Sequence, residues 1–283
     1  MQIIVVRCGA PEVEIPAGYQ VVDVSAVPTR QELRPLDEAA AAILPEDPTP
    51  SLEEISKRPD VEHLGAPGPA PQPVPEALRV IVVGTDAALS AVLTRMMRAD
   101  YMWVEVGFVP TAASTAAQNW RIPCDSPDAA FQLALNGTVS PVPLIRNDKG
   151  LAVAGSATIS EWSNGPLAGE IIVDDEVLMR GEADYGARLV PMLDAPGIAA
   201  AKAVGPVATH EQLGLDAPRR GLFGFLRGRP GVGQLEPASL ATGRAVQAGG
   251  RELRVIVDGI SAKRPVKGST FYRHLRDLQI VRP

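Results

Sequence analysis

The pattern of apolar and polar positions predicts a strand, a turn and a helix at 79–97, RVIVVGTDAALSAVLTRMM. The aliphatic run at 80–83 is typical of a buried strand, and 84–86 has the composition of a turn. Apolar residues then recur at helical spacing over 89–97, which indicates one buried helix face. An open α/β sheet places its binding site at a turn of this kind. We therefore expect a ligand site, present or ancestral, at this turn.

The same alternation of strand and helix continues through the first half of the chain. We expect strands at 3–6, 20–24 and 103–108, a helix at 112–120, and a further helix that begins after Ser126 as its N-cap. These elements predict an N-terminal α/β domain over residues 1–144.

A segment within this domain, 45–75, is too rich in proline to form a helix or a central strand. We expect an exposed loop there. A plain spacer is the favoured interpretation, and a proline-recognition motif is the alternative.

Beyond Gly137 the helical spacing is lost, and short alternating runs are separated by Gly, Pro and Asn-Asp. This texture predicts an antiparallel β domain over 145–274, and we expect residues 275–283 to form a closing strand that returns to the first domain. The predicted fold class is thus an α/β N-terminal domain with a C-terminal β-sandwich domain. The expected strands of the second half are 142–145, 151–153, 168–173, 176–179, 187–192, 252–257 and 278–281.

Composition narrows the classes of function. Hydrophobic residues make up 46% of the chain and the formal net charge is -6, so we expect no nucleic-acid partner. No run approaches the roughly 18 apolar residues of a membrane span, and the start of the chain does not resemble a secretory signal. We therefore expect a cytoplasmic protein. Cys8 and Cys124 are too isolated for a zinc site and are interpreted as two inert thiols.

The motifs of the chain resemble, in order and spacing, the catalytic domain of bacterial diacylglycerol kinases and their sphingosine-kinase relatives. The family's signature is a strand ending in GGDGT, and here the five positions read GTDAA at 84–88. Gly84 and Asp86 match, whereas Thr85, Ala87 and Ala88 replace two glycines and the threonine.

Further motifs extend the resemblance over residues 79–283. The family's second loop, of the type GTxND, corresponds to the region of Ala112 and Ser114, where its glycine and asparagine are missing. The family's DGE at the end of a late strand corresponds to Asp258, Gly259 and Ile260, so the glutamate is replaced.

The resemblance implies a lipid-kinase-like two-domain architecture with a cleft between the domains. In an active member of the family, the glycines let the backbone approach phosphate and point N–H groups at it. Because both loops have lost these residues, we favour a degenerate member without kinase activity that binds a lipid or a partner protein and needs no cofactor. Its vestigial nucleotide-binding residues are Gly84, Thr85, Asp86, Ala112 and Ser114. The alternative is a divergent ATP-dependent lipid kinase that uses ATP and magnesium.

The roles of several acidic residues stay open at this point. Asp86 is either a ligand-binding acceptor or the N-cap of its helix. Asp258 is either a turn residue or a neighbour of the site. The cluster at 174–176 is favoured as a solvated hairpin turn over a magnesium site, so no metal site is expected. We interpret His63, His210 and His274 as surface or packing residues.

A second candidate site is a basic and apolar stretch at 217–235, which we call the basic loop. Its arginines could hold anionic headgroups while its apolar residues enter a membrane interface, and a partner protein could use the same groups. The alternative is that the apolar residues pack back on the β domain. The oligomeric state is left open. The residues concerned are Arg219, Arg220, Leu222, Phe223, Phe225, Arg227 and Arg229.

Overall fold

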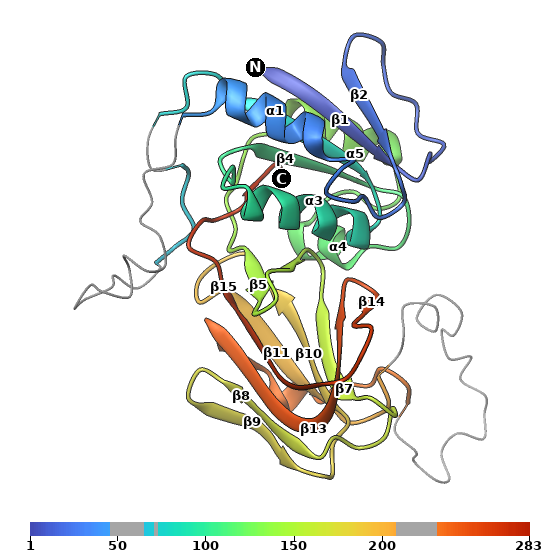
Figure 1. Cartoon of the computed structure of the whole chain (residues 1–283), viewed down its shortest axis with the longest axis vertical. Coiled ribbons are helices and arrows are strands. Elements are labelled where there is room, and N and C mark those ends of the chain that lie inside the picture. Colours follow the sequence, from blue (N-terminus) through green and yellow to red (C-terminus); the bar gives the residue numbers. More distant parts are fainter. Residues whose placement is uncertain (46–64, 71–72, 208–230) are drawn as a thin grey trace.

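The computed structural model describes residues 1–45, 65–70, 73–207 and 231–283. Two domains lie one above the other, and both ends of the chain lie in the upper one (Figure 1). The upper domain contains a parallel sheet with helices, and the lower domain is antiparallel β structure. The fold class predicted from the hydrophobic pattern is therefore confirmed.

The α/β domain is built on a five-stranded parallel sheet in the order β16-β4-β3-β1-β2. Its central strand β3 is buried at every position, because both faces of the sheet are covered. The strands are β1 (Gln2–Cys8), β2 (Gln20–Val24), β3 (Leu78–Gly84), β4 (Glu105–Pro110) and β16 (Gln279–Ile280).

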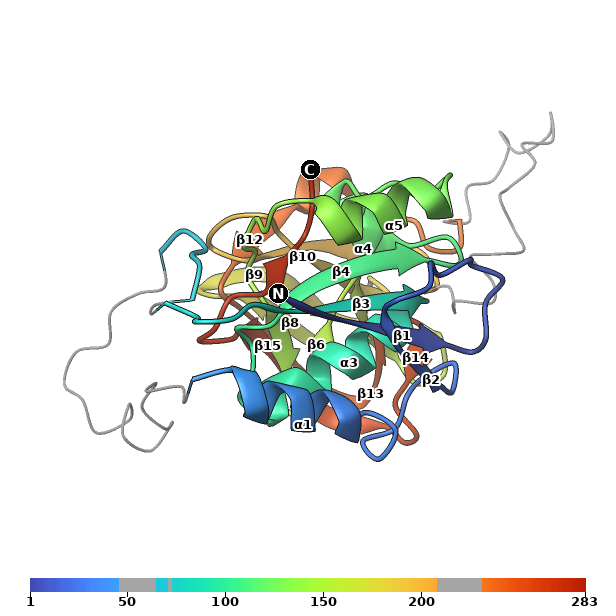
Figure 2. The same ribbon diagram turned by 90° about the horizontal axis from the view of Figure 1, so that it is seen from above.

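Helices cover the two faces of this sheet. Figure 2 shows α1 and α3 on one face and α5 on the other. The sequence analysis did not predict α1, although its apolar residues recur at helical spacing, with Leu36 and Ala40 buried one turn apart. The helices are α1 (Arg34–Ile43), α3 (Asp86–Arg98), α4 (Thr115–Trp120) and α5 (Pro127–Asn136).

Hydroxyl side chains cap three of these helices. Ser126 accepts a hydrogen bond from the N–H of Ala129, as predicted for α5, and Ser114 caps α4 in the same way. The interpretation of Asp86 as a cap of its own helix is wrong. Thr85 is the N-cap of α3, since its Oγ1 accepts from the N–H of Ala88 at 3.3 Å.

The β domain is one branched antiparallel sheet that folds into two layers. Strand β13 belongs to both: its first half pairs with β8 and β15, and after an irregularity near Gly249 its second half pairs with β7. Its strands are β5 (Ile145–Asn147), β6 (Ala152–Val153), β7 (Ala157–Glu161), β8 (Gly169–Val173), β9 (Glu176–Gly181), β10 (Gly186–Pro191), β11 (Ile198–Ala203), β12 (Ala241–Gly243), β13 (Ala245–Val257), β14 (Ile260–Ser261) and β15 (Val266–Arg273), with a 3-10 turn at Pro237–Ser239.

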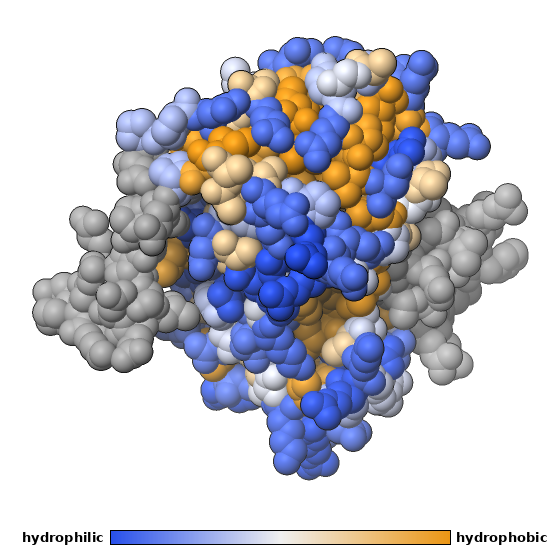
Figure 3. All heavy atoms as spheres, turned by 45° about the horizontal axis from the view of Figure 1, so that its top comes forward, coloured by the Kyte–Doolittle hydropathy of each residue, from blue (hydrophilic) through white to orange (hydrophobic). Residues whose placement is uncertain are grey.

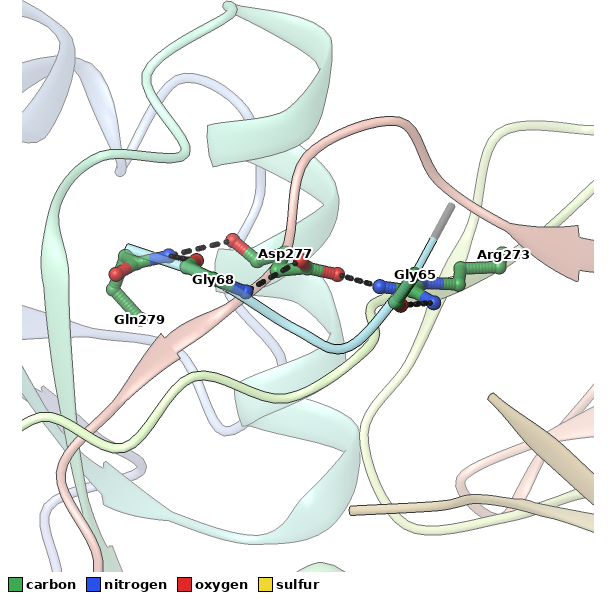
Figure 4. A network of polar contacts seen from close by, with 5 residues as sticks. All are labelled: Gly65, Gly68, Arg273, Asp277 and Gln279. Atoms are coloured by element: carbon green, nitrogen blue, oxygen red, sulfur yellow. Dashed lines mark hydrogen bonds and ion pairs between the residues drawn. The ribbon is translucent and has the colours of Figure 1, made fainter. Parts of the chain in front are cut away.

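The chain returns to the first domain at its end, where β16 adds to the sheet beside β4. Part of the proline-rich segment docks on this return (Figure 4). Asp277 accepts from the N–H of Gly68 at 3.0 Å and pairs with the Arg273 guanidinium at 2.8 Å, while Arg273 also donates to the carbonyl of Gly65. The segment is thus bound to the part of the chain that passes from the β domain back to the α/β domain.

Two features of the chain lie wholly or partly outside the described residues. Most of the basic loop, including all seven of its named residues, falls within 208–230, and most of the proline-rich segment falls within 46–64 and 71–72. In the described part of the chain, no helix is long and apolar enough to cross a membrane.

Candidate interdomain site

The candidate site begins where β3 and β4 end, at the edge of the parallel sheet that faces the β domain. Gly84 ends β3 in a tight position, since a Cβ there would lie 2.9 Å from that of Cys8 and 3.0 Å from that of Ala88. Thr85 follows with φ −88° and ψ 170°, which is ordinary extended backbone. The replacement of glycine by threonine is therefore accommodated without strain, because the turn has a different shape from one that needs a left-handed residue.

The carboxylate of Asp86 is directed at the start of α4. It accepts hydrogen bonds from the Ser114 hydroxyl at 2.5 Å, from the N–H of Thr115 at 2.8 Å and from the N–H of Ala116 at 3.2 Å. These N–H groups belong to the first turn of α4, which lacks partners within the helix. Asp86, which is 6% exposed, thus fills the anion position at that helix end with a side chain of the protein itself.

Asp258 likewise accepts hydrogen bonds from a second set of backbone N–H groups, in the turn before β7. It is 4% exposed, lies in the turn between β13 and β14, and accepts from the N–H groups of Ala154, Gly155 and Ser156 at 2.7 to 2.9 Å. Burial raises the pKa of Asp258 to about 7, the nearby charge of Asp86 raises it too, and the three N–H donors lower it. Asp258 is therefore both a turn residue, with φ 47°, and part of the site.

Gly155 connects these two carboxylates. Its N–H donates to Asp258, its carbonyl accepts from the Asn119 side chain at 2.9 Å, and a Cβ on it would lie 2.5 Å from Oδ2 of Asp86. Only glycine allows the backbone of the β domain to approach the first turn of α4 this closely.

Arg188 of β10 reaches across from the β domain to complete the site. Its guanidinium donates to Oγ1 of Thr115 at 3.2 Å and to Oγ of Ser156 at 3.3 Å. Burial lowers the pKa of Arg188, whereas the charges of Asp258 and Asp86 raise it. The cleft therefore holds one cation and two carboxylates from the protein itself.

The space left among these groups is a cavity of about 60 Å³, lined by Asp86, Asp258 and Arg188 with their neighbours. Pockets for small molecules usually measure about 300–1,000 Å³. Each carboxylate has about four acceptor positions and already uses three. Magnesium and a triphosphate do not fit the groups as they stand.

A larger cavity, of about 320 Å³, lies between α3 and the β13–β14 turn. We call it the α3 cavity. Its walls come from both domains, with Ala87 and Ala91 on α3 facing Val255, Val257 and Ile260 of the β domain. Ala87 and Ile260 occupy positions that the sequence comparison assigned to a family glycine and a family glutamate.

The remaining predicted residues lie elsewhere. Ala112 is exposed in the turn before α4 and takes no part in these contacts. Asp174 is a hairpin residue with φ 51° whose carboxylate accepts from the N–H groups of Arg244 and Ala245. The described residues include no cluster of three or more His, Cys, Asp or Glu placed to hold a metal ion.

His274 lies half-buried where the chain crosses from the β domain to the α/β domain, and His63 and His210 are outside the described residues. Cys8 and Cys124 are both free thiols.

Comparison with solved structures identifies the architecture. A diacylglycerol kinase from Bacillus anthracis str. Sterne aligns with a TM-score of 0.59 at 9% sequence identity, over 100% of this chain and 97% of that chain. This chain has the diacylglycerol-kinase fold. A further structure from the same organism aligns with a TM-score of 0.55 at 10% identity, over 100% of this chain and 98% of that one. An NAD kinase from Archaeoglobus fulgidus reaches a TM-score of only 0.44 at 10% identity, over 99% and 94% of the two chains.

No family model matches the chain, and no curated protein matches it either. At this low identity the likeness to solved structures establishes the diacylglycerol-kinase fold and nothing about activity. The resemblance drawn from the motifs is confirmed at the level of fold.

Sequence reasoning missed three residues that shape the site: Gly155, Asn119 and Arg188. Gly155 and Arg188 belong to no recognisable motif, and each of the three residues acts through a contact between distant segments of the chain. The only local signal is the Gly-Ser pair at 155–156, which is typical of any turn.

Proposed function

We propose that this protein is a non-phosphorylating member of the diacylglycerol-kinase fold that binds a lipid in the cavity between its two domains. The observation that supports it most is the occupation of both sets of backbone donors by Asp86 and Asp258. In a phosphate site these N–H groups would point at the ligand.

A nucleotide would have to displace these carboxylates at a high free-energy cost. Hydrogen bonds to charged groups contribute about 1.5–3 kcal/mol each, and the Asp86 carboxylate makes three of them. A triphosphate placed nearby would also be repelled by two buried acids. The site is therefore built around its own side chains, and no cofactor is needed to complete it.

The lipid part of the proposal is supported by the α3 cavity, which is large enough for a ligand and has apolar walls. The basic loop stays a predicted contact with a lipid headgroup or a partner protein, and cytoplasmic placement peripheral to a membrane stays a prediction as well.

A phosphoryl-transfer assay tests the proposal directly. Purified protein is incubated with magnesium, ATP labelled at the γ-phosphate, and dioctanoylglycerol in mixed micelles, beside an active diacylglycerol kinase as a positive control. We expect no labelled lipid above the level of a no-protein blank. Transfer that scales with protein concentration and is lost in Asp86→Ala would overturn the proposal.

The second candidate is an active, divergent lipid kinase, and one observation favours it. A buried carboxylate whose pKa is raised to about 7, as at Asp258, has the properties of a general base near neutral pH. It is less well supported, because phosphoryl transfer also needs a phosphate cradle and a metal, and their places are filled.

A further inference from the structure

Apolar residues of both domains line two opposite walls of the α3 cavity. Ala87 and Ala91 are one helical turn apart on α3, so their small side chains leave a shallow channel along the helix. Val255, Val257 and Ile260 form the opposite wall. Three of the large apolar residues that line the cavity are exposed, Val27 by 42%, Leu151 by 39% and Ile260 by 55%, and their gathering at one place marks a surface suited to an apolar ligand.

The uncharged polar side chains that line the cavity, and Arg95 among the charged ones, already have partners within the protein. Ser90 and Thr94 of α3 bind the backbone of Ala152, at 2.6 and 2.9 Å. The Asn147 side chain accepts from two N–H groups of its own hairpin, and Arg95 is paired with Asp37. Ser261 and Ser269 also have hydrogen-bond partners. Few hydrogen-bonding groups of the cavity lining are therefore left to bind the polar edge of a nucleotide base.

Cations gather at the mouth of the cavity. Arg30, which precedes α1, and Lys149, in the β5–β6 turn, are exposed and have no acidic partner among the described residues. Arg98 binds only the backbone carbonyls of Lys149 and Gly150, so its charge is not neutralised by an acid either. The described lining contains no Asp or Glu, in a chain whose net charge is -6.

Figure 3 shows how hydrophilic and hydrophobic surface is distributed on one face of the molecule. Hydrophilic side chains form a belt across the middle of this face, with hydrophobic surface above it in the α/β domain and again below it. A ligand that binds both the apolar walls and the cations of the α3 cavity needs an apolar chain and a negatively charged head.

We infer that the α3 cavity binds a single-chain amphiphile with an anionic head, such as a fatty carboxylate or an alkyl phosphate. The inference rests on the proposed function, because it takes the cavity as the ligand site. The chain lies along Ala87 and Ala91, and the head is held by Arg30 and Lys149. A neutral diacylglycerol would leave these cations without a partner, and a volume of about 320 Å³ is at the lower end for ligand pockets.

Titration calorimetry with soluble amphiphiles tests the inference. The probes are octanoate, decanoate and dodecanoate, with dodecyl phosphate to vary the acid and monolauroylglycerol as the neutral molecule of matched chain. Below their micelle concentrations we expect affinity to rise about fourfold for each added methylene until the cavity is full, as apolar burial predicts. We expect both dodecyl anions to bind at least about tenfold more tightly than the neutral lipid.

Two variants locate the site. Arg30→Ala with Lys149→Ala should weaken dodecanoate by about tenfold or more, whereas the charge-matched control Arg34→Ala with Lys267→Ala, outside the cavity lining, should leave affinity unchanged. Ala91→Trp fills the channel and should block binding; its melting temperature shows whether the protein remains folded. Should Ala91→Trp unfold, the charge variants still decide the question.

The possible failures are distinguishable. Equal affinity for monolauroylglycerol and dodecanoate, binding that the double variant does not change, or no binding of any anionic probe would each overturn this inference. The proposed function would survive those results if dioctanoylglycerol bound without being phosphorylated. Phosphoryl transfer to dioctanoylglycerol would instead overturn the proposed function.

Discussion

The carboxylate of Asp86 lies where a side chain on Gly155 would begin. A Cβ on Gly155 would be 2.5 Å from Oδ2 of Asp86 and 2.8 Å from the backbone nitrogen of Ala116. Real Cβ atoms do not approach other atoms this closely. The two domains can therefore be in contact here only because residue 155 has no side chain. The contact holds the first turn of α4 against the turn before β7.

Gly155→Ala should therefore lower the free energy of unfolding by about 1–3 kcal/mol, since the new methyl group forces the backbone and the carboxylate apart. Urea denaturation measures the change. Gly165→Ala is the matched control, because its nearest atom would be 3.6 Å away, and we expect a change within about 0.5 kcal/mol. Equal stability of the two variants would show that the close contact does not exist.

Asp86 and Ser114 should act as one unit. Ser114 donates to Asp86 and caps α4, so removing either side chain disturbs the same helix end. Ser114→Ala should cost about 1–2 kcal/mol and Asp86→Ala, which removes three hydrogen bonds to a charged group, more than about 3 kcal/mol; the double variant should deviate from additivity by about 0.5–3 kcal/mol. Asp86→Ala combined with Ser126→Ala, which removes the cap of α5, should be additive. Additivity in both pairs would contradict the assignment of Asp86 as a partner of α4.

The raised pKa of Asp258 predicts how the free energy of unfolding changes with pH. Its pKa is raised from 3.8 to about 7 in the folded protein, so between these values the folded state binds more protons than the unfolded chain. The contribution of Asp258 to stability is complete below about pH 4 and declines as the pH rises to about 7.

Asp258→Asn cannot titrate, so the stability that it loses relative to the wild type should be larger at pH 5 than at pH 8. Urea titrations of both proteins at these two values measure the difference, and other titrating groups cancel. A loss that grows with pH would mean that the native carboxylate is stabilised in its charged form.

The proline-rich segment should depend on Asp277 for its attachment. Asp277 binds the N–H of Gly68 and the Arg273 guanidinium, whose side chain is only 1% exposed. Asp277→Ala leaves this cation without its carboxylate and should cost about 3–5 kcal/mol, with faster hydrogen exchange at the Gly68 amide. Glu170→Ala breaks the exposed pair with Arg180 and should cost less than about 1 kcal/mol. Unchanged exchange at Gly68 would contradict the attachment.

Much of the fold could be predicted because its elements carry local signals. The strand at 80–83 is a continuous aliphatic run, and the hydroxyl of Ser126 before Pro127 marks the start of α5. Strands β11, with the sequence IAAAKA, and β15 were missed, since their residues show no clear alternation and become strands only through pairing with distant partners.

The site was predicted less completely, for a physical reason. Gly84, Thr85, Asp86 and Ser114 could be located because they follow strand ends, but what Asp86 binds depends on α4, 28 residues away in sequence. Asp258 was left open between two roles and has both. Gly155 and Arg188 matter only through contacts between the domains, and such contacts leave no periodic signal in a single sequence.

The central claim is that the backbone donors of the cleft are taken by Asp86 and Asp258 and so do not bind nucleotide. Titration calorimetry of the wild-type protein with magnesium and ATP tests it most directly, with thermal unfolding as a second readout. We predict no saturable heat and no thermal shift, whereas a ligand at 100 times its dissociation constant would add about 2.7 kcal/mol. Saturable binding of Mg-ATP that is abolished by Asp86→Ala would contradict the claim.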